Sequence, residues 1–121
     1  MLLFGSLSRK LVPVCRYYGL PSAGLNTHFF SASVQECAAV AVNWPTQWLL
    51  ETPNAFYVFL PNMADGSCTS GTVPLYRLYN NRPDVNHRYT TSLAIRQQMI
   101  SAGWIPEGYG NMAVGMCVVA S

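Results

Sequence analysis

The hydrophobic pattern of the chain alternates short β-rich runs with apolar segments of helical spacing, separated by loops of Gly, Pro and Asn. Four runs of β-branched and aromatic residues predict strands: Val12 to Tyr18, His28 to Ala32, Val73 to Tyr79, and His87 to Thr91. Successive side chains of a strand point to opposite faces. We therefore expect the face of Cys15 and Tyr17, and the matching face of Tyr76 and Leu78, to pack beneath helices.

The segments that follow the second and fourth runs predict helices. The first helix begins at a capping box, in which the Ser33 hydroxyl accepts from the Glu36 amide and the Glu36 carboxylate reaches back. It must end before Pro45, because the residue before a proline is pushed out of the helical region. The second helix should span about Leu93 to Ala102, with Gly103 as the left-handed residue that follows it.

The order of these elements indicates a tandem duplication. Four blocks of one half match four blocks of the other in the same order: residues 12–19 with 73–80, 27–33 with 86–92, 48–51 with 104–107, and 55–58 with 115–118. We predict one compact α+β domain, in which two strand-strand-helix-strand copies share a core, with an antiparallel sheet and two short helices. The pattern leaves open whether the copies form one continuous sheet or two packed layers. Copy one is residues 12–60, the linker 61–72 and copy two 73–121, whereas residues 1–11 are an N-terminal linker or a cloning remnant.

Composition excludes several classes of protein. The chain has 121 residues, of which 50% are hydrophobic and 10% charged, so it carries enough apolar material for one folded domain and is not disordered. A net charge of +2, with scattered basic residues, argues against nucleic acid as a partner. No apolar run approaches the roughly 20 residues that span a bilayer, and the opening residues are too short for a signal-peptide core. We expect no membrane partner.

The cysteines predict disulfides. Four occur, at Cys15, Cys37, Cys68 and Cys117, and no pair has C-x-x-C spacing. An even, dispersed set is typical of an extracellular or secreted protein. The sequence shows no signal peptide, which is explained if the chain is a fragment or C-terminal module of a longer precursor. Cys15 takes the place of Tyr76, and Cys117 takes that of Tyr57, so the two cysteines replace aromatic core positions of opposite copies. We therefore favour the pairs Cys15–Cys117 and Cys37–Cys68. Pairing within copies, Cys15–Cys37 and Cys68–Cys117, is the main alternative.

Six motifs carry a resemblance to a known family: Val-Pro-Val-Cys-Arg-Tyr-Tyr-Gly, His-Phe-Phe-Ser-Ala-Ser, Glu-Cys-Ala-Ala-Val, Gly-Thr-Val-Pro-Leu-Tyr-Arg-Leu-Tyr-Asn, Asn-His-Arg-Tyr-Thr-Thr and Gly-Trp-Ile-Pro-Glu-Gly-Tyr-Gly. From Val12 to Val118 the chain resembles the repeat family of unknown function numbered five-six-four-eight. Members look like C-terminal or tandem modules of secreted bacterial and fungal proteins, often beside hydrolases that act on cell walls or peptides. The resemblance implies no activity. Copy one departs from the pattern at residues 44–48 and 51–52, so the resemblance does not extend a ligand role to copy one.

Copy two supplies the residue types of a carbohydrate site. Such sites combine an exposed aromatic platform with a few fixed polar groups. The candidates are Arg77, Tyr79, His87, Tyr89, Trp104, Glu107 and Tyr109. The alternative is that these aromatic side chains belong to the core, where aromatic residues at strand spacing commonly lie.

Two duplicated residue pairs bear on metal binding and catalysis. His28 and His87 match, but zinc takes three or four ligands and no third histidine exists, so we expect no metal, no cofactor, and a backbone partner for each imidazole. Glu51 and Glu107 have the residue type of a glycosidase pair. A duplicated glutamate nevertheless pairs most simply with the duplicated arginines, Arg16 and Arg77, so we expect no catalytic residues.

These observations predict a secreted, non-catalytic accessory module that binds a glycan or cell-wall polymer, lectin-like in its chemistry. A parent hydrolase or a surface protein is a further expected partner. The alternative function is protein interaction or structural assembly, which includes inhibition of a peptidase.

Overall fold

A computed structural model describes residues 10–120 and has an antiparallel α+β fold braced by two disulfides. The elements are β1 (Leu11–Gly19), the 3-10 turn η1 (Pro21–Ala23), β2 (Thr27–Ser31), α2 (Val34–Asn43), β3 (Trp48–Phe59), β4 (Thr72–Tyr79), β5 (His87–Thr90), α3 (Leu93–Ser101), β6 (Ile105–Glu107) and β7 (Val114–Val119). The predicted α+β class and the two short helices are confirmed. Of the expected N-terminal linker, residues 1–9 lie outside the described part, and Leu11 already belongs to β1.

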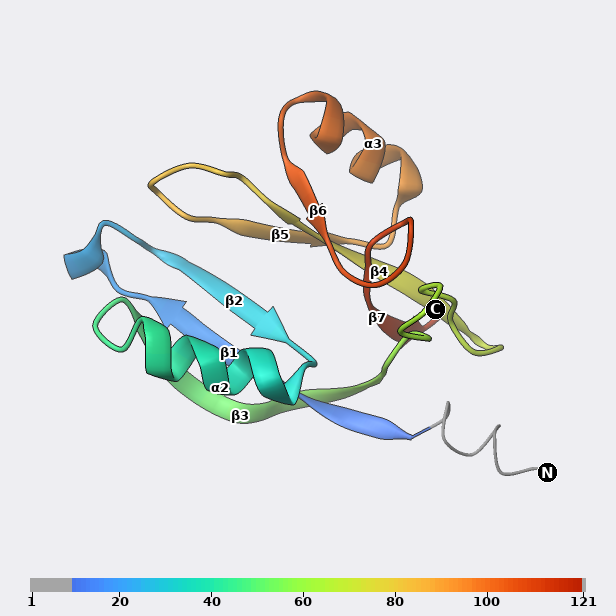
Figure 1. Cartoon of the computed structure of the whole chain (residues 1–121), viewed down its shortest axis with the longest axis horizontal. Helices are drawn as coiled ribbons and strands as arrows, with labels where there is room; N and C mark the ends of the chain where they lie inside the picture. Colours follow the sequence, from blue (N-terminus) through green and yellow to red (C-terminus); the bar gives the residue numbers. More distant parts are fainter. Residues whose placement is uncertain (1–9, 121) are drawn as a thin grey trace.

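All the strands join one sheet, in the order β2-β1-β3-β7-β4-β5, with β6 also paired to β4. The three strands of copy one therefore lie together, and those of copy two follow (Figure 1). The two sets meet where Phe59 of β3 pairs with Cys117 of β7. The copies thus form one continuous sheet, whereas the sequence left open whether they form one sheet or two packed layers.

The strand registers agree with the internal alignment of the sequence. Val12 pairs with Val58 in copy one, and the matching Val73 pairs with Val118 in copy two. One element differs from the expectation, because the third strand of copy two is divided into β6 and β7 by a loop. Copy two has extra residues between these strands. In copy one, β3 continues through the same place, and its pairing with β1 shifts register on both sides of Arg16.

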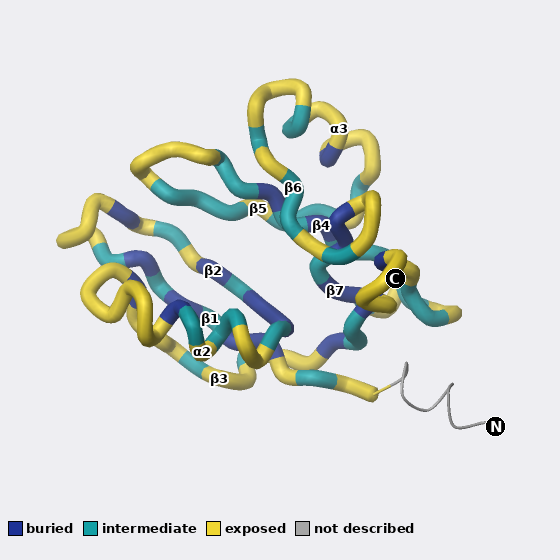
Figure 2. The backbone as a smooth tube through the Cα atoms, in the orientation of Figure 1, coloured by how far each residue is buried: buried dark blue, intermediate teal, exposed yellow. Residues whose placement is uncertain are grey.

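The helices cover the faces that alternation predicts. Cys15 and Tyr17 are buried beside α2 with Phe29 and Trp48, and Tyr76 and Leu78 pack against side chains of α3. Buried residues lie mostly in β1, β2, β4 and β7, whereas most positions of the two helices are exposed or half-buried (Figure 2). Burial of these apolar side chains is the main force that holds each helix on the sheet.

The favoured disulfide pairing is wrong, and the within-copy alternative is correct. Cys15 bonds Cys37, and Cys68 bonds Cys117, with Cα separations of 6.3 and 5.6 Å. The equivalence of Cys117 with Tyr57 holds, since they pair with Pro74 and Pro13. However, β3 lies between β1 and β7, and two strand spacings of about 4.8 Å exceed the reach of a disulfide.

The ends of the helices follow the sequence signals with one exception. The Ser33 hydroxyl accepts from the Glu36 amide at 3.1 Å, and Gly103 after α3 has a φ of 103°. The Glu36 carboxylate does not reach back to Ser33, because it binds the Ser31 hydroxyl at 2.6 Å and Arg77 of copy two. The capping box is thus half formed, and its glutamate joins the two copies instead.

The outer strands β2 and β5 contact each other through side chains. The Tyr89 hydroxyl accepts from the Phe30 amide at 2.8 Å and donates to the Phe30 carbonyl at 3.0 Å. Thr27 donates to the Asn86 side chain at 2.7 Å nearby. A tyrosine hydroxyl therefore occupies both exposed backbone groups of Phe30, and burial raises the pKa of Tyr89 far above its ordinary value.

Tyr89→Phe is expected to lower the free energy of unfolding by about 1 to 3 kcal/mol, because the Phe30 amide then loses its partner and the Phe30 carbonyl keeps only the longer bond from Arg77, at 3.4 Å. Urea unfolding followed by circular dichroism measures the change. The matched control is Tyr18→Phe, whose hydroxyl donates to Asn26 at an exposed position. An equal loss in both variants contradicts a special role for the Tyr89 hydroxyl.

Candidate functional site

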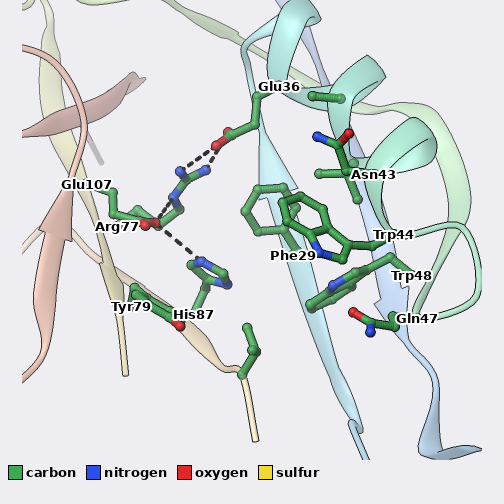
Figure 3. A pocket seen from close by; sticks show the side chains of 13 residues that line it. Phe29, Glu36, Asn43, Trp44, Gln47, Trp48, Arg77, Tyr79, His87 and Glu107 are labelled. Atoms are coloured by element: carbon green, nitrogen blue, oxygen red, sulfur yellow. Dashed lines mark hydrogen bonds and ion pairs between the residues drawn. The ribbon is translucent and has the colours of Figure 1, made fainter. Parts of the chain in front are cut away.

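A pocket of about 490 Å³ lies between the two copies. Copy one contributes Phe29, Glu36, Ala39, Val40, Asn43, Trp44, Gln47 and Trp48, and copy two contributes Arg77, Tyr79, Val85, His87 and Glu107. Trp44 and Trp48, at the end of α2 and the start of β3, face Tyr79 and His87 across the pocket (Figure 3). The walls therefore combine five aromatic side chains with amide, charged and aliphatic groups.

Arg77 is the centre of an ion-pair network on one wall. Its two terminal nitrogens donate to the two carboxylate oxygens of Glu36, at 2.7 and 2.9 Å, and its Nε donates to Glu107 at 3.0 Å. His87 Nε2 lies 3.3 Å from the same oxygen of Glu107. Because Glu36 lies in the first turn of α2 in copy one, this network ties copy one to copy two.

Aromatic rings enclose the network. The Arg77 guanidinium lies over the Phe29 ring, 4.8 Å from its centroid. His87 meets the edge of Phe29 at 4.8 Å and stacks on Tyr79 at 5.4 Å. The Arg77 side chain is only 14% exposed, so the rings shield its charge from water and strengthen the ion pairs.

Two effects oppose each other at the carboxylates of the network. Burial raises the pKa of Glu36 and of Glu107, but the bonds to Arg77 and, for Glu107, to His87 outweigh it. The pKa of each carboxyl group is therefore below its ordinary value. Although burial acts in the opposite direction, the carboxylates raise the pKa of Arg77, so the guanidinium stays charged.

Stability is expected to fall when the solution is acidified. A carboxyl group whose pKa is lower in the folded chain stabilises the fold above its unfolded pKa, near 4.5 here, and loses that effect as the pH drops through the folded value. The urea midpoint, measured from pH 7 to pH 2, should decline below about pH 4.5. Glu36→Gln should flatten this decline, and an unchanged slope in this variant contradicts the assignment.

The residues of the network are duplicated in copy one. Arg16 Nε donates to Glu51 at 2.8 Å, His28 Nε2 lies 3.2 Å from the same oxygen, and Tyr18 packs on His28 at 5.3 Å. We call Arg16, Tyr18, His28 and Glu51 the copy-one tetrad, and Arg77, Tyr79, His87 and Glu107 the copy-two tetrad. The predicted pairing of each glutamate with the arginine of its own copy is confirmed. The expected backbone partners of the histidines are wrong, because each imidazole meets a glutamate.

The model of a family described as Domain of unknown function (DUF5648) matches residues 4–114. The chain belongs to this family. The resemblance found in the sequence is thereby confirmed. No curated protein and no solved structure matches the chain.

The residues predicted as a ligand site in this DUF5648 chain fall into three groups. Arg77, Tyr79, His87 and Glu107 line the pocket between the copies. Tyr89 and Tyr109 line an adjoining hollow of about 210 Å³, which shares Arg77 and Glu107 with the pocket. Trp104 lies apart, because it packs against the buried cluster beneath α3, with the Arg88 guanidinium 5.7 Å from its ring.

Sequence reasoning missed the wall that copy one contributes. Trp44 and Trp48 lie in the segment where copy one departs from the family pattern, and this departure argued against a ligand role. In the structure it supplies two of the aromatic side chains of the pocket. The two tryptophans, four residues apart beside Pro45 and Gln47, were the signal that was available.

Other features of this DUF5648 chain concern metals, membranes and its compartment. Among residues 10–120, no group of three or more His, Cys, Asp or Glu side chains is placed to hold a metal ion. Within the same residues, no helix is long and apolar enough to cross a membrane. All four cysteines form disulfides, which indicates maturation in an oxidising environment.

Proposed function

We propose that the chain is a secreted, non-catalytic accessory module that binds a carbohydrate or another cell-surface polymer in the pocket between its two copies. The observation that carries this proposal is the aromatic pocket itself. Trp44 and Trp48 face Tyr79 across it, with the Asn43 and Gln47 amides at its rim. Aromatic faces stack on the apolar face of a sugar ring, and amides hydrogen-bond to its hydroxyl groups.

The electrostatics of the pocket support binding rather than hydrolysis. A general acid needs a pKa near the working pH, whereas Arg77 holds the pKa of Glu36 and of Glu107 below the ordinary value. Each carboxylate is also engaged by the guanidinium that it neutralises. Glu51, the other half of the glycosidase pair considered above, is bound to Arg16 of its own copy.

Binding to insoluble polysaccharides and bacterial cell walls, with tryptophan fluorescence as the readout, tests this function. Trp44 and Trp48 line the pocket and Trp104 does not, so a ligand should change the emission of two of the three tryptophans. Trp44 is 46% exposed, so Trp44→Ala should keep the fold and weaken binding by about tenfold or more.

The matched control is Tyr57→Ala, which removes an aromatic side chain that is 55% exposed and lies outside the pocket. The proposal predicts unchanged binding for this control. If no polymer binds at high protein concentration, or if Trp44→Ala binds like the parent chain, the pocket is not a carbohydrate site.

A second candidate function is protein interaction or assembly. It is favoured by large apolar side chains of β3, since Leu49, Leu50 and Phe56 are each at least 43% exposed. Apolar groups of this size commonly lie in interfaces. Sedimentation analysis tests assembly directly: a monomer at all concentrations removes self-association from this candidate.

A further inference from the structure

The copy-one and copy-two tetrads share the same pairings but differ at the arginine. In copy two, both terminal nitrogens of Arg77 are bound to the Glu36 carboxylate. In copy one, Nε of Arg16 binds Glu51, and neither terminal nitrogen has a partner among residues 10–120. The position that aligns with Glu36 in copy two is Ile95, so α3 offers no carboxylate of this kind. In copy one, the two terminal guanidinium nitrogens of Arg16 are therefore available to a ligand.

The copy-one tetrad is open, whereas the copy-two tetrad is covered. The side chains of Arg16 and His28 are 40% and 46% exposed, against 14% and 10% for Arg77 and His87. The difference arises because copy one lies over the copy-two tetrad through Phe29 and Glu36. No described segment covers the copy-one tetrad in the same way.

A row of aromatic rings lies beside Arg16 on the same face of the sheet. Tyr18 packs on His28 at 5.3 Å, His28 lies 6.4 Å from Phe30, and Phe30 lies 5.9 Å from Phe56. Cross-strand pairing sets this arrangement, because Arg16 pairs with Phe30 and Tyr18 with His28. We call Tyr18, His28, Phe30 and Phe56 the aromatic row.

We propose that Arg16 and the aromatic row form a second binding site, which takes a carboxylate-bearing sugar, a uronate residue of an acidic polysaccharide. The uronate carboxylate binds the two free terminal nitrogens of Arg16, as Glu36 binds those of Arg77. The sugar ring stacks on the aromatic row. This assignment rests on the proposed carbohydrate function for its ligand class, but it uses none of the residues that line the pocket.

Charge and geometry favour this occupant. Arg16 is paired with one carboxylate and Arg77 with two. A ligand carboxylate on Arg16 would therefore give it the same two carboxylate partners that Arg77 already has. The planar guanidinium matches a carboxylate in two parallel hydrogen bonds, which a lysine cannot form. The row has exposed rings at His28 and Phe56 and half-buried rings at Tyr18 and Phe30. Such a row on a sheet face suits a polymer, whose successive residues extend beyond the site.

Titration of the full oxidised chain with a galacturonate oligomer tests the assignment. The readouts are the side-chain Nε–H resonance of Arg16 in a nitrogen-15 spectrum and the Kd from calorimetry. A neutral galactose oligomer of the same length and a tetraglutamate peptide are titrated in parallel. We expect the uronate to bind more tightly than either and to shift the Arg16 resonance, and we expect added salt to weaken it.

Four variants locate the site. Arg16→Ala and Arg16→Lys should each weaken uronate binding by about tenfold or more, because both lose the charge-assisted pair of hydrogen bonds. Arg82→Ala removes the same charge from an exposed arginine elsewhere and should leave the Kd unchanged. Trp44→Ala, which opens the pocket, should also leave it unchanged.

Each contrary result overturns the assignment. An equal loss in Arg82→Ala means nonspecific charge attraction, and a loss in Trp44→Ala alone places the sugar in the pocket. If the neutral oligomer binds equally well, the carboxylate does not contribute to recognition. If tetraglutamate binds equally well, the ligand is an acidic peptide and not a uronate. If uronate binds at Arg16 while no polymer responds to Trp44→Ala, the pocket proposal fails and this one stands.

Discussion

Arg77→Ala is expected to lower the free energy of unfolding by about 3 to 5 kcal/mol, the largest effect of any single exchange considered for this chain. The variant leaves the carboxylates of Glu36 and Glu107 facing each other without the cation that neutralises both. It also removes the only ionic contact between α2 and copy two among the described residues. Urea unfolding at pH 7, followed by tryptophan fluorescence, measures the loss.

The duplication provides the control for this prediction. Arg16→Ala breaks the matching pair with Glu51, but that pair is exposed to water and should contribute less than about 1 kcal/mol. Arg77→Lys keeps the charge without the fork, so it should recover only part of the stability. If Arg77→Ala costs no more than Arg16→Ala, burial of the copy-two tetrad does not strengthen its ion pairs.

Replacement of Cys68 and Cys117 by alanine is expected to destabilise the fold by about 4 kcal/mol, and replacement of Cys15 and Cys37 by about 3 kcal/mol. The order follows from loop length, because the Cys68–Cys117 bond closes a loop of 49 residues and the Cys15–Cys37 bond closes one of 22. A longer closed loop removes more conformational freedom from the unfolded chain. Thermal unfolding of the two double variants, each with one intact disulfide, gives the comparison.

The bonds themselves are checked first by mass spectrometry of peptides from the unreduced protein. Peptides that link Cys15 to Cys37, and Cys68 to Cys117, are expected. The single variant Cys68→Ala should expose one free thiol, that of Cys117, to a labelling reagent in the unfolded chain. A greater loss of stability from the shorter loop would show that native packing, not loop closure, decides the order.

The sequence was sufficient to predict the elements and the buried faces, because these depend on local periodicity. Alternation along β1 identified Tyr17 as buried, and Gly103 marked the end of α3. Disulfide pairing depends instead on which strands are neighbours. Cys15 takes the place of Tyr76, which is buried, and Cys117 that of Tyr57, which is exposed. Nothing in the local pattern places β3 between the two cysteines.

The candidate site was predictable only in its copy-two half. Arg77, Tyr79, His87 and Glu107 recur as types in copy one, so the duplication points to them. The facing wall depends on how the copies pack, and no periodicity reports that. Glu36 illustrates the limit: its spacing from Ser33 fits a capping box, but the tertiary ion pair with Arg77 takes its carboxylate.

The hydroxyl of Tyr89 has a consequence for solubility. An edge strand with free amide and carbonyl groups is a template for another chain, and aggregation often begins at such an edge. On β2, the amide and carbonyl of Phe30 are already occupied by Tyr89 of β5, so β5 shields this part of the β2 edge. The Tyr89 hydroxyl thus opposes fibrous assembly at this edge. Copy one has phenylalanine, Phe30, at the position that matches Tyr89 and so cannot supply the same hydroxyl.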